Sequence, residues 1–329
     1  MNRDVSAGSA PGAAGRLTLP GLWELSGRVH AEAGFQGLRK RAAYVARARA
    51  VAPLLATLLD AAPSSLLGGY VAGRAPTVLG LVEAPYINAR WDAETRLKAF
   101  IRHCALLATM GPAFDFALNE SVKLPPIEAL GPDYTVILDK PAWGQREGLL
   151  AISVFRGNVR LFSLSFSFDE IEGRKTILIG GVQGRRIEGA LEEYSRLTDL
   201  AHGLHPRKLL IEILRMIGAE VGTERILAIS DRCRHHRHPF FGKKAEKLPL
   251  DYDEIWRDRD GEATGDGSFF ELPLTRLVRD LGDLAELSPR KRKKRRHQYR
   301  LRYPMLDVIE ADLRAALPGL VPEVRPEPE

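Results

Sequence analysis

The chain has 329 residues, 45% of them hydrophobic and 27% charged, which excludes a disordered or fibrous protein and predicts a globular one. Its only two cysteines, Cys104 and Cys233, exclude a disulfide framework and favour a reducing compartment. The small, polar N-terminus does not resemble a signal peptide, and no segment approaches the apolar run of roughly 20 residues that spans a bilayer. We therefore expect a cytoplasmic protein without a transmembrane segment.

The formal net charge of +6 comes from one segment near the C-terminus. Nine Lys and Arg residues, and no acidic residue, lie between Arg290 and Arg302, so the rest of the chain carries 6 − 9 = −3. Any argument from positive charge to a binding partner therefore concerns this segment and not the whole protein.

The first part of the chain is predicted to be helical. After a leader at residues 1–20, which is expected to be disordered, one helix is predicted over residues 38–59. A second helix is predicted to begin after Asp92, a good N-cap, and to end before Gly111. Proline-containing turns near residue 130 then mark a change of architecture, so this helical part is assigned to residues 21–130.

The sequence from residue 134 onward predicts an α+β domain with a mixed sheet. Segments rich in β-branched and aromatic residues predict strands at 134–139, 149–155, 159–168, 175–182, 225–230 and 268–272. Helices are predicted at 188–201, from Pro206 onward, and near the C-terminus at 289–303 and 304–317. The domain is assigned to residues 131–320, and the Pro-rich tail at 321–329 is expected to be disordered.

The strand predicted at 159–168 has two different faces. Large apolar side chains alternate along it with small ones, mostly serines: Phe162, Leu164, Phe166 and Phe168 against Leu161, Ser163, Ser165 and Ser167. We therefore expect one face packed under aromatic side chains and one face lined by small hydroxyl groups.

The most informative feature is a glycine-rich strand end, residues 180–184, followed by a helix that opens at Pro206. Proline suits the first helical position, and free N–H groups, the helix dipole and nearby cations together favour a phosphate or carboxylate. The residues predicted to hold this anion are Gln183, Gly184, Arg185, Arg186, Gly203, Arg207 and Lys208. The alternative, which we weigh equally, is a solvated helix start with glycines used for turns.

Three residues are candidates for proton transfer. His202 and His205 flank the turn before Pro206, and the charge of a histidine changes near neutral pH. Tyr252, within the acidic segment 251–256, is a candidate general acid. The structural alternatives are that His205 caps the helix and that segment 251–256 is an acidic first helical turn, which we favour for that segment.

The segment from Cys233 to His238 contains four potential metal ligands within six residues. Structural zinc usually takes two ligand pairs from separate segments, and no second Cys/His pair is available. The two interleaved arginines also oppose a cation. We therefore assign no metal and interpret the segment as a basic loop beside an anionic ligand.

The basic run admits three interpretations. It is a solvated helix start, a nucleic-acid contact or a surface attracted to an anionic membrane leaflet. Only Tyr299 and Tyr303 lie near its end, so a base-stacking platform is not supported. We rank the membrane above nucleic acid, with contact residues Lys291, Arg292, Lys293, Lys294, Arg295 and Arg296.

The order of an antiparallel meander, a helix and a further strand resembles the acyltransferases of the GNAT superfamily. In that superfamily a helix N-terminus receives the pyrophosphate of an acyl-CoA, so the resemblance implies an acyl-CoA or another phosphorylated donor. The chain departs from the superfamily's glycine loop, because about twenty residues separate Gln183-Gly184-Arg185-Arg186 from Pro206.

Four short motifs resemble the VirK/YbjX family of Gram-negative bacteria, a family of unknown function. They appear in order as Gly180-Gly181-Val182-Gln183-Gly184, then Thr198 to Leu210, then Asp251-Tyr252-Asp253-Glu254-Ile255-Trp256, and finally Lys294 to Tyr303. The resemblance implies a factor of envelope integrity, linked to antimicrobial-peptide resistance and to virulence.

Two hypotheses follow for function. The first is a cytoplasmic, membrane-proximal transferase of acyl or aminoacyl groups that modifies an envelope component. The second is a non-enzymatic stress factor that binds anionic lipid or a partner protein at the membrane periphery.

Overall fold

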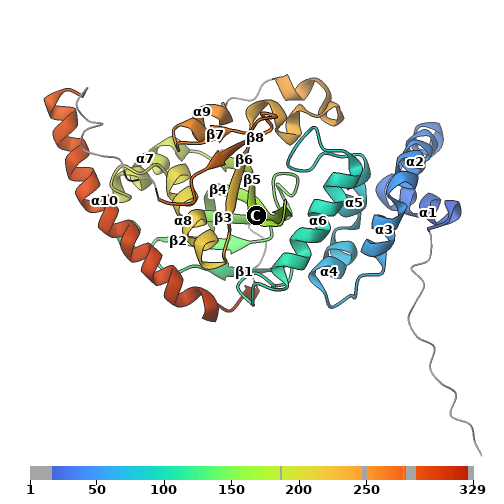
Figure 1. Cartoon of the computed structure of the whole chain (residues 1–329), viewed down its shortest axis with the longest axis horizontal. Coiled ribbons are helices and arrows are strands. Elements are labelled where there is room, and N and C mark those ends of the chain that lie inside the picture. The colour runs from blue at the N-terminus through green and yellow to red at the C-terminus, as the bar shows by residue number, and fades with distance from the viewer. Residues whose placement is uncertain (1–16, 186, 247–249, 277, 279–286, 325–329) are drawn as a thin grey trace, which may run out of the picture. The chain divides into compact units, whose positions relative to one another are not determined.

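The computed structural model describes residues 17–185, 187–246, 250–276, 278 and 287–324 (Figure 1). The chain divides into two compact units, Met1–Glu83 and Ala84–Glu329. The predicted leader lies mostly outside the described residues, and so does Arg186.

The first unit is helical. Its elements are α1 (Leu19–Val29), α2 (Gly34–Ala48), the 3-10 turn η1 (Arg49–Val51), α3 (Ala52–Leu59), α4 (Leu66–Gly73), α5 (Ala75–Leu79) and the 3-10 turn η2 (Gly80–Val82). The side chains of Thr18 and Ser65 accept hydrogen bonds from the first turns of α1 and α4. The Tyr44 hydroxyl, fully buried, donates to the carbonyl of Leu79 at 3.1 Å and ties α2 to α5.

One helical stretch in this unit, Gly34–Leu59, is long and apolar enough by length and composition to cross a membrane. From the sequence, no such segment was predicted. The stretch is interrupted by η1, where the 3-10 turn precedes Pro53.

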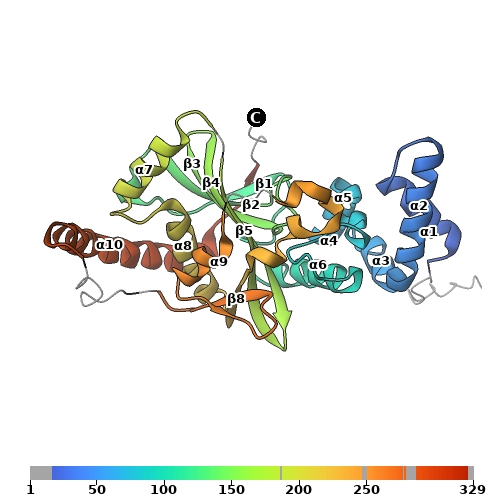
Figure 2. The same ribbon diagram turned by 90° about the horizontal axis from the view of Figure 1, so that it is seen from above.

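The second unit is built on one nine-stranded sheet in the order β7-β8-β6-β5-β4-β3-β2-β1-β9. Its strands are β1 (Glu120–Lys123), β2 (Tyr134–Asp139), β3 (Leu150–Arg156), β4 (Val159–Ile171), β5 (Arg174–Gly184), β6 (Arg225–Ile229), β7 (Glu262–Ala263), β8 (Phe269–Leu272) and β9 (Glu323–Val324). Strands β2 to β5 form the predicted antiparallel meander (Figure 2). Strand β6 joins β5 in parallel. With a helical first unit, this mixed sheet confirms the predicted α+β class.

Helices and 3-10 turns surround this sheet. They are α6 (Ala93–Leu107), η3 (Glu128–Leu130), α7 (Ala190–Leu200), α8 (Pro206–Glu220), η4 (Asp231–Cys233), η5 (His235–Arg237), η6 (Pro239–Glu246), α9 (Tyr252–Arg257), α10 (Pro289–Ala316) and η8 (Leu317–Gly319). Helix α8 packs on β3, β4 and β5, and α10 packs on α8 (Figure 1). Helix α6 packs on β4 as well, so the core lies between the sheet and the helices α6 and α8.

Both faces of β4 are buried, which goes beyond the predicted alternation. On the aromatic face, Phe168 stacks on His103 of α6 with 6.5 Å between ring centroids. On the hydroxyl face, Ser163, Ser165 and Ser167 are each exposed by 2% or less. A covering element must therefore lie over the serines, and the loop between β2 and β3 supplies it.

Three boundaries differ from the sequence assignment. Helix α6 belongs with the sheet, because the backbone N–H of Phe168 donates to Nδ1 of His103, so the units divide after Glu83 and not near residue 130. Helix α10 runs without a break through Pro304. Part of the predicted disordered tail, Glu323–Val324, pairs with the edge strand β1, whose backbone groups would otherwise lack partners.

Candidate functional site around Glu147

The loop between β2 and β3 presses onto the hydroxyl face of β4 and buries Glu147. The backbone N–H of Leu149 donates to Oγ of Ser167 at 3.0 Å. Gly148 has φ +159, and a Cβ there would lie 2.4 Å from the backbone nitrogen of Phe166. The contact is too close for any side chain at residue 148, so the loop is held at a fixed height above the strand.

The glycine pair Gly180-Gly181 in β5 makes room for Glu147. A Cβ on Gly180 would lie 2.0 Å from the Glu147 carbonyl oxygen, and one on Gly181 would lie 2.2 Å from Oε2 of its carboxyl group. The register between β4 and β5 shifts at Ser165/Phe166, so Gly180 is the extra residue of a β-bulge. These two glycines of the predicted anion loop therefore accommodate a carboxylate from the chain itself.

Beyond the bulge, β5 and β6 separate, and α9 fills the gap. Their pairing ends at Ile179 and Ala228. The Tyr252 hydroxyl accepts from the N–H of Val182 at 2.9 Å and donates to its carbonyl at 3.2 Å. On the other strand, Trp256 Nε1 donates to the carbonyl of Ile229 at 2.8 Å. Two buried aromatic residues thus cover backbone groups that the separation would leave unpaired.

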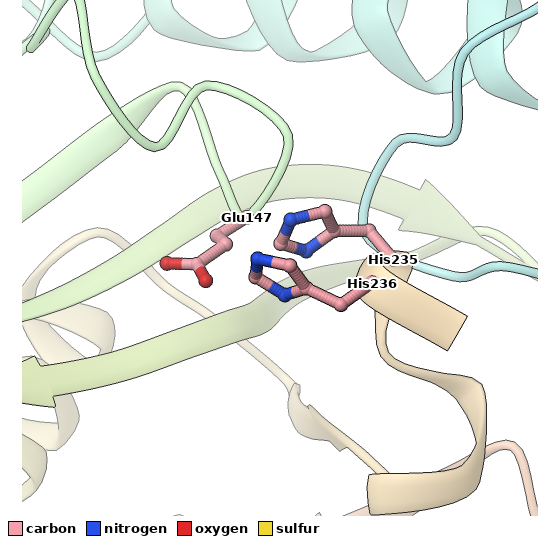
Figure 3. Close-up of side chains that lie close together, drawn as sticks. All are labelled: Glu147, His235 and His236. Atoms are coloured by element: carbon pink, nitrogen blue, oxygen red, sulfur yellow. The ribbon is translucent and has the colours of Figure 1, made fainter. Parts of the chain in front are cut away.

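Two histidines complete the cluster. His235 and His236 lie on η5, just after β6, with ring centroids 3.7 Å apart. One ligand atom of each, together with a carboxylate oxygen of Glu147, lies within 4.8 Å of the others (Figure 3). Nδ1 of each histidine is buried and has no hydrogen-bond partner among the described residues. Cys233 is not part of this group, because its Sγ faces Oγ of Ser268 at 3.9 Å.

Burial sets the ionisation of these groups. It raises the pKa of Glu147 from 4.5 to about 7, although the Arg234 guanidinium acts in the opposite direction. Burial is the main cause that lowers the pKa of His235 to about 2, and the neighbouring His236, Arg234 and Arg146 act in the same direction. The same effect of burial and of cations lowers the pKa of His236. Near neutral pH both imidazoles are therefore neutral, and Glu147 exchanges its proton in the working range of a general base.

Three donor atoms this close together also have the chemistry to hold a metal ion. However, the guanidinium groups of Arg146 and Arg234 that disfavour protonated histidines disfavour a divalent cation for the same reason. Acid–base chemistry at Glu147 is therefore the interpretation that the electrostatics favour.

The predicted anion-binding residues gather elsewhere, around the N-terminus of α8. His205 is the N-cap: its Nδ1 accepts the N–H of Arg207 at 3.2 Å. Its ring packs edge-on against Phe162 and Tyr194, and burial lowers its pKa to about 4. His205 therefore caps the helix, as the structural alternative predicted, and its ring occupies the helix end that an anion would approach.

The two cations of this turn differ. Lys208 is paired with Asp258 at 2.5 Å. Arg207 is half-buried, its pKa is lowered by burial, and its Nε has no hydrogen-bond partner among the described residues. If an anion binds here, Arg207 is therefore the group available to it.

Contacts from α10 hold the turn before α8. His202 has a positive φ of 52°, and its carbonyl accepts from the Arg302 guanidinium at 2.9 Å. Gly203 also has a positive φ, and a Cβ there would lie 2.5 Å from the Gln298 amide nitrogen. The geometry of both residues follows from this packing, and a catalytic role for His202 stays a prediction.

The three remaining predicted anion-binding residues that the structure describes, Gln183, Gly184 and Arg185, do not lie together at the N-terminus of α8. Gln183 belongs to the Glu147 site, since its Nε2 donates to Oε2 of Glu147 at 3.4 Å. Gly184 lies under the Tyr194 ring, where a Cβ would be 2.4 Å from the hydroxyl oxygen, and Arg185 is exposed.

The basic run lies on the N-terminal half of α10. Lys291, Lys293, Lys294, Arg295 and Arg296 are exposed, whereas Arg292 is half-buried. A hollow of about 890 Å³ lies along this part of α10, away from Glu147, and its lining residues include Arg292, Lys293, Arg296 and Arg300. The run therefore presents most of its charge to solvent.

Comparison with known proteins identifies the family. The family model described as "Protein of unknown function (DUF535)" matches residues 34–315. The chain belongs to the DUF535 family. The prediction of the VirK/YbjX family is confirmed, because the relatives of this DUF535 protein include YbjX of Escherichia coli K12, at 27% identity over 252 residues. That match covers 75% of the chain and 74% of YbjX.

Two further relatives complete the comparison. A Haemophilus influenzae protein is 28% identical to this DUF535 protein over 238 residues, which are 70% of the chain and 75% of the relative. The Mannheimia haemolytica protein named "Membrane protein LapB" is 22% identical over 151 residues, 45% of the chain and 63% of LapB. No solved structure matches the chain.

Glu147 was not predictable from the sequence of this DUF535 protein. The residue lies in a loop without a recognisable motif, and nothing near it in the sequence indicates a function. The sequence signals of the site are the glycine pair at 180–181 and the histidine pair at 235–236, which by themselves indicate an anion-binding strand end and a basic loop. A carboxylate between them was not inferable, because the three segments are far apart in the chain.

The raised pKa of Glu147 predicts a pH-dependent cost to stability. The pKa of Glu147 in the folded protein, about 7, exceeds its ordinary value of 4.5. The protonated carboxyl group therefore contributes its full stabilisation below about pH 4.5, and this stabilisation is lost as the pH rises through 7. Relative to Glu147→Gln, the wild type should lose about 3 kcal/mol of unfolding free energy between pH 5 and pH 8. Urea unfolding of both proteins across that range measures this difference, and parallel pH profiles would contradict a buried, titrating Glu147.

The glycine contacts predict different effects at neighbouring positions. Gly180→Ala places a methyl against backbone and should destabilise the protein by about 3 kcal/mol, as overpacking does. Gly181→Ala meets the movable end of Glu147 and should cost less while displacing the carboxylate. Gly69→Ala, in open space on α4, is the control and should stabilise by about 0.5 kcal/mol. Chemical denaturation ranks the three, and equal effects at 180 and 69 would refute the packing argument.

Proposed function

We propose that this DUF535 protein is an envelope-associated transferase of acyl or aminoacyl groups in which Glu147 is the general base. The observation that carries the proposal is the buried Glu147 carboxyl group, held by Gly180 and Gly181 at the bulge where β5 and β6 separate. An antiparallel meander followed by a helix and then a further strand is also the element order that resembles the GNAT acyltransferases.

In the proposed transfer step, Glu147 acts as the base and Tyr252 as the acid. Glu147 takes the proton from an amine or hydroxyl of the acceptor as its lone pair attacks the donor's carbonyl carbon. A new amide or ester bond forms, the donor's thioester or ester bond breaks, and the leaving group takes a proton. Tyr252 supplies that proton: burial keeps its pKa well above the usual value, so the phenol is protonated. Its hydroxyl lies on Val182, two residues beyond the bulge.

The neutral histidines fit this scheme as positioning groups. His235 and His236 lie beside Glu147, with one donor atom of each within 4.8 Å of its carboxyl group, and their lowered pKa values keep both imidazoles neutral, so they add no positive charge that would fix Glu147 in its ionised form. Arg234, stacked 3.7 Å over the Tyr252 ring, links the base and the acid of the scheme electrostatically.

The donor's anionic part is assigned to the N-terminus of α8. Arg207 supports this assignment, since it is half-buried and its Nε has no hydrogen-bond partner in the described part of the chain, whereas Lys208 is already paired with Asp258. The donor's reactive arm would have to lie along β5, where Tyr252 now occupies both backbone groups of Val182. Donor binding therefore requires Tyr252 to exchange its strand contacts for contacts with the donor.

The envelope setting rests on the family. The resemblance to VirK/YbjX implies a role in envelope integrity and antimicrobial-peptide resistance, and the relative from Mannheimia haemolytica carries a membrane protein's name. A cytoplasmic position at the inner membrane accords with this setting and with the basic face of α10.

The transferase proposal predicts separable losses of binding and turnover. With acetyl-CoA and a long-chain acyl-CoA as probes, Arg207→Ala should weaken binding at least tenfold, by loss of an ion pair to phosphate. Glu147→Gln should bind as the wild type does but release free thiol at least a hundredfold more slowly, as expected for loss of a general base. Calorimetry and a thiol-release assay with an envelope extract as acceptor measure the two effects.

The matched control for that experiment is Arg196→Ala, an exposed arginine on α7 that belongs to neither site. It should leave both quantities close to wild type. If no acyl donor binds or stabilises the wild-type protein, the transferase proposal is wrong.

A second candidate is a non-enzymatic factor at the membrane periphery, favoured by the exposed charge on α10. Five exposed basic side chains in one helical segment are attracted to anionic lipid by about 1 kcal/mol each. Replacing Lys291, Lys293, Lys294, Arg295 and Arg296 by Gln should then abolish restoration of peptide resistance in a host lacking its homologue. In that case the Glu147→Gln variant should restore resistance fully. If the protein is a transferase, Glu147→Gln should instead fail to restore resistance, and the α10 variant should retain it. Survival assays with a cationic peptide distinguish the two.

A further inference from the structure

The first two helices of the N-terminal unit expose large apolar side chains. Phe35 is 81% exposed, Leu38 53%, Leu19 49% and Trp23 37%. Leu19 and Trp23 are four residues apart on α1, and Phe35 and Leu38 are three apart on α2, so each pair lies on one face of its helix. Exposed aromatic and aliphatic groups in such a short segment mark an interaction surface.

These exposed residues are not the core-facing side of their helices. The inward faces are occupied by other residues, with Leu22 and Leu25 buried on α1 and Tyr44 and Ala48 buried on α2. The unit therefore has its own core, and Phe35 and Leu38 leave most of their surface outside it. Exposure of these groups to water is unfavourable unless they contact something else.

The surroundings of these residues are basic. Residues 19–49 contain six Lys and Arg and two Glu, a net charge of 6 − 2 = +4. Arg28 and Arg39 are exposed. The Arg41 guanidinium lies 4.4 Å over the Trp23 ring and donates to the Trp23 carbonyl at 2.9 Å. A cation stacked on an exposed tryptophan combines one apolar and one positive group at the same place.

We propose that α1 and α2 form a membrane-interfacial surface that binds an anionic lipid bilayer. Trp23, Phe35 and Leu38 enter the region between headgroups and acyl chains, and the flanking arginines contact lipid phosphates. Charge complementarity selects this occupant over a neutral apolar protein groove. The inference concerns lipid contact by the first unit and is independent of the chemistry at Glu147.

The surface lies on the bilayer and does not span it. The stretch Gly34–Leu59 has the length and hydropathy of a membrane span. However, several of its apolar residues, including Val51, Leu55 and Leu58, are buried in the folded chain. Insertion of the whole stretch would require the unit to unfold, whereas the exposed residues of α1 and the start of α2 reach lipid without any rearrangement.

The test uses the full-length protein with vesicles of phosphatidylcholine alone or with 30% phosphatidylglycerol. Wild type should sediment with the anionic vesicles, and its tryptophan emission should shift to the blue and be quenched by brominated acyl chains. The double variant Phe35→Ser/Leu38→Ser should bind at least tenfold more weakly. The control Leu191→Ser, which alters a 79% exposed leucine on α7, should bind as wild type does.

Three outcomes would overturn the proposal. One is wild-type binding by the Phe35→Ser/Leu38→Ser variant while it retains the native circular dichroism spectrum. Another is a change in that variant's sedimentation velocity without any loss of vesicle binding, which would identify a second copy of the chain as the occupant. The third is complete loss of binding on neutralising Lys291 to Arg296 alone. Glu147→Gln should bind vesicles as wild type does, so failure of the transferase proposal is scored separately.

Discussion

The burial of Glu147 against strand β5 is the constraint on which the second unit's organisation depends. A carboxyl group in that position requires glycine at 180 and 181, because any larger residue would overlap the loop or its side chain. The bulge at Gly180 coincides with the point where β5 leaves β6, and α9 then supplies Tyr252 and Trp256 to satisfy the parted strands. Loop, bulge, strand separation and α9 are therefore parts of one arrangement around a single acidic side chain.

Electrostatics give this arrangement its chemical character. Removal from water favours the protonated carboxyl group, and it favours neutral histidines for the same reason. Arg234 partly restores the ionised form of Glu147, so the group is balanced near neutrality and not locked in one state. The N-terminus of α8 differs, because His205 and Asp258 already satisfy its cap and one of its cations. The two places accordingly suit different parts of a substrate.

The predictability of the elements follows the range of the interactions that specify them. Strands 134–139 and 225–229, the Asp92 cap and the Pro206 helix start were all predictable, since each depends on neighbouring residues. The division near residue 130 differs from the structure because α6 docks on β4 through His103 and Phe168, a contact without local signature. Likewise, β9 exists only because β1 offers a free edge.

The sequence by itself determined the α+β class, the family, the glycine pair, the histidine pair and the basic segment, because periodicity, turn chemistry and motif order are local properties. Only the tertiary structure decided what the glycines are for. The sequence alone indicated an anion-binding strand end, whereas the fold brings Glu147 onto that strand from a separate loop. It also turned His205 into a helix cap and left Arg207 as the available cation. The physical reason is that burial and close approach are set by segments far apart in the chain, which no local pattern encodes.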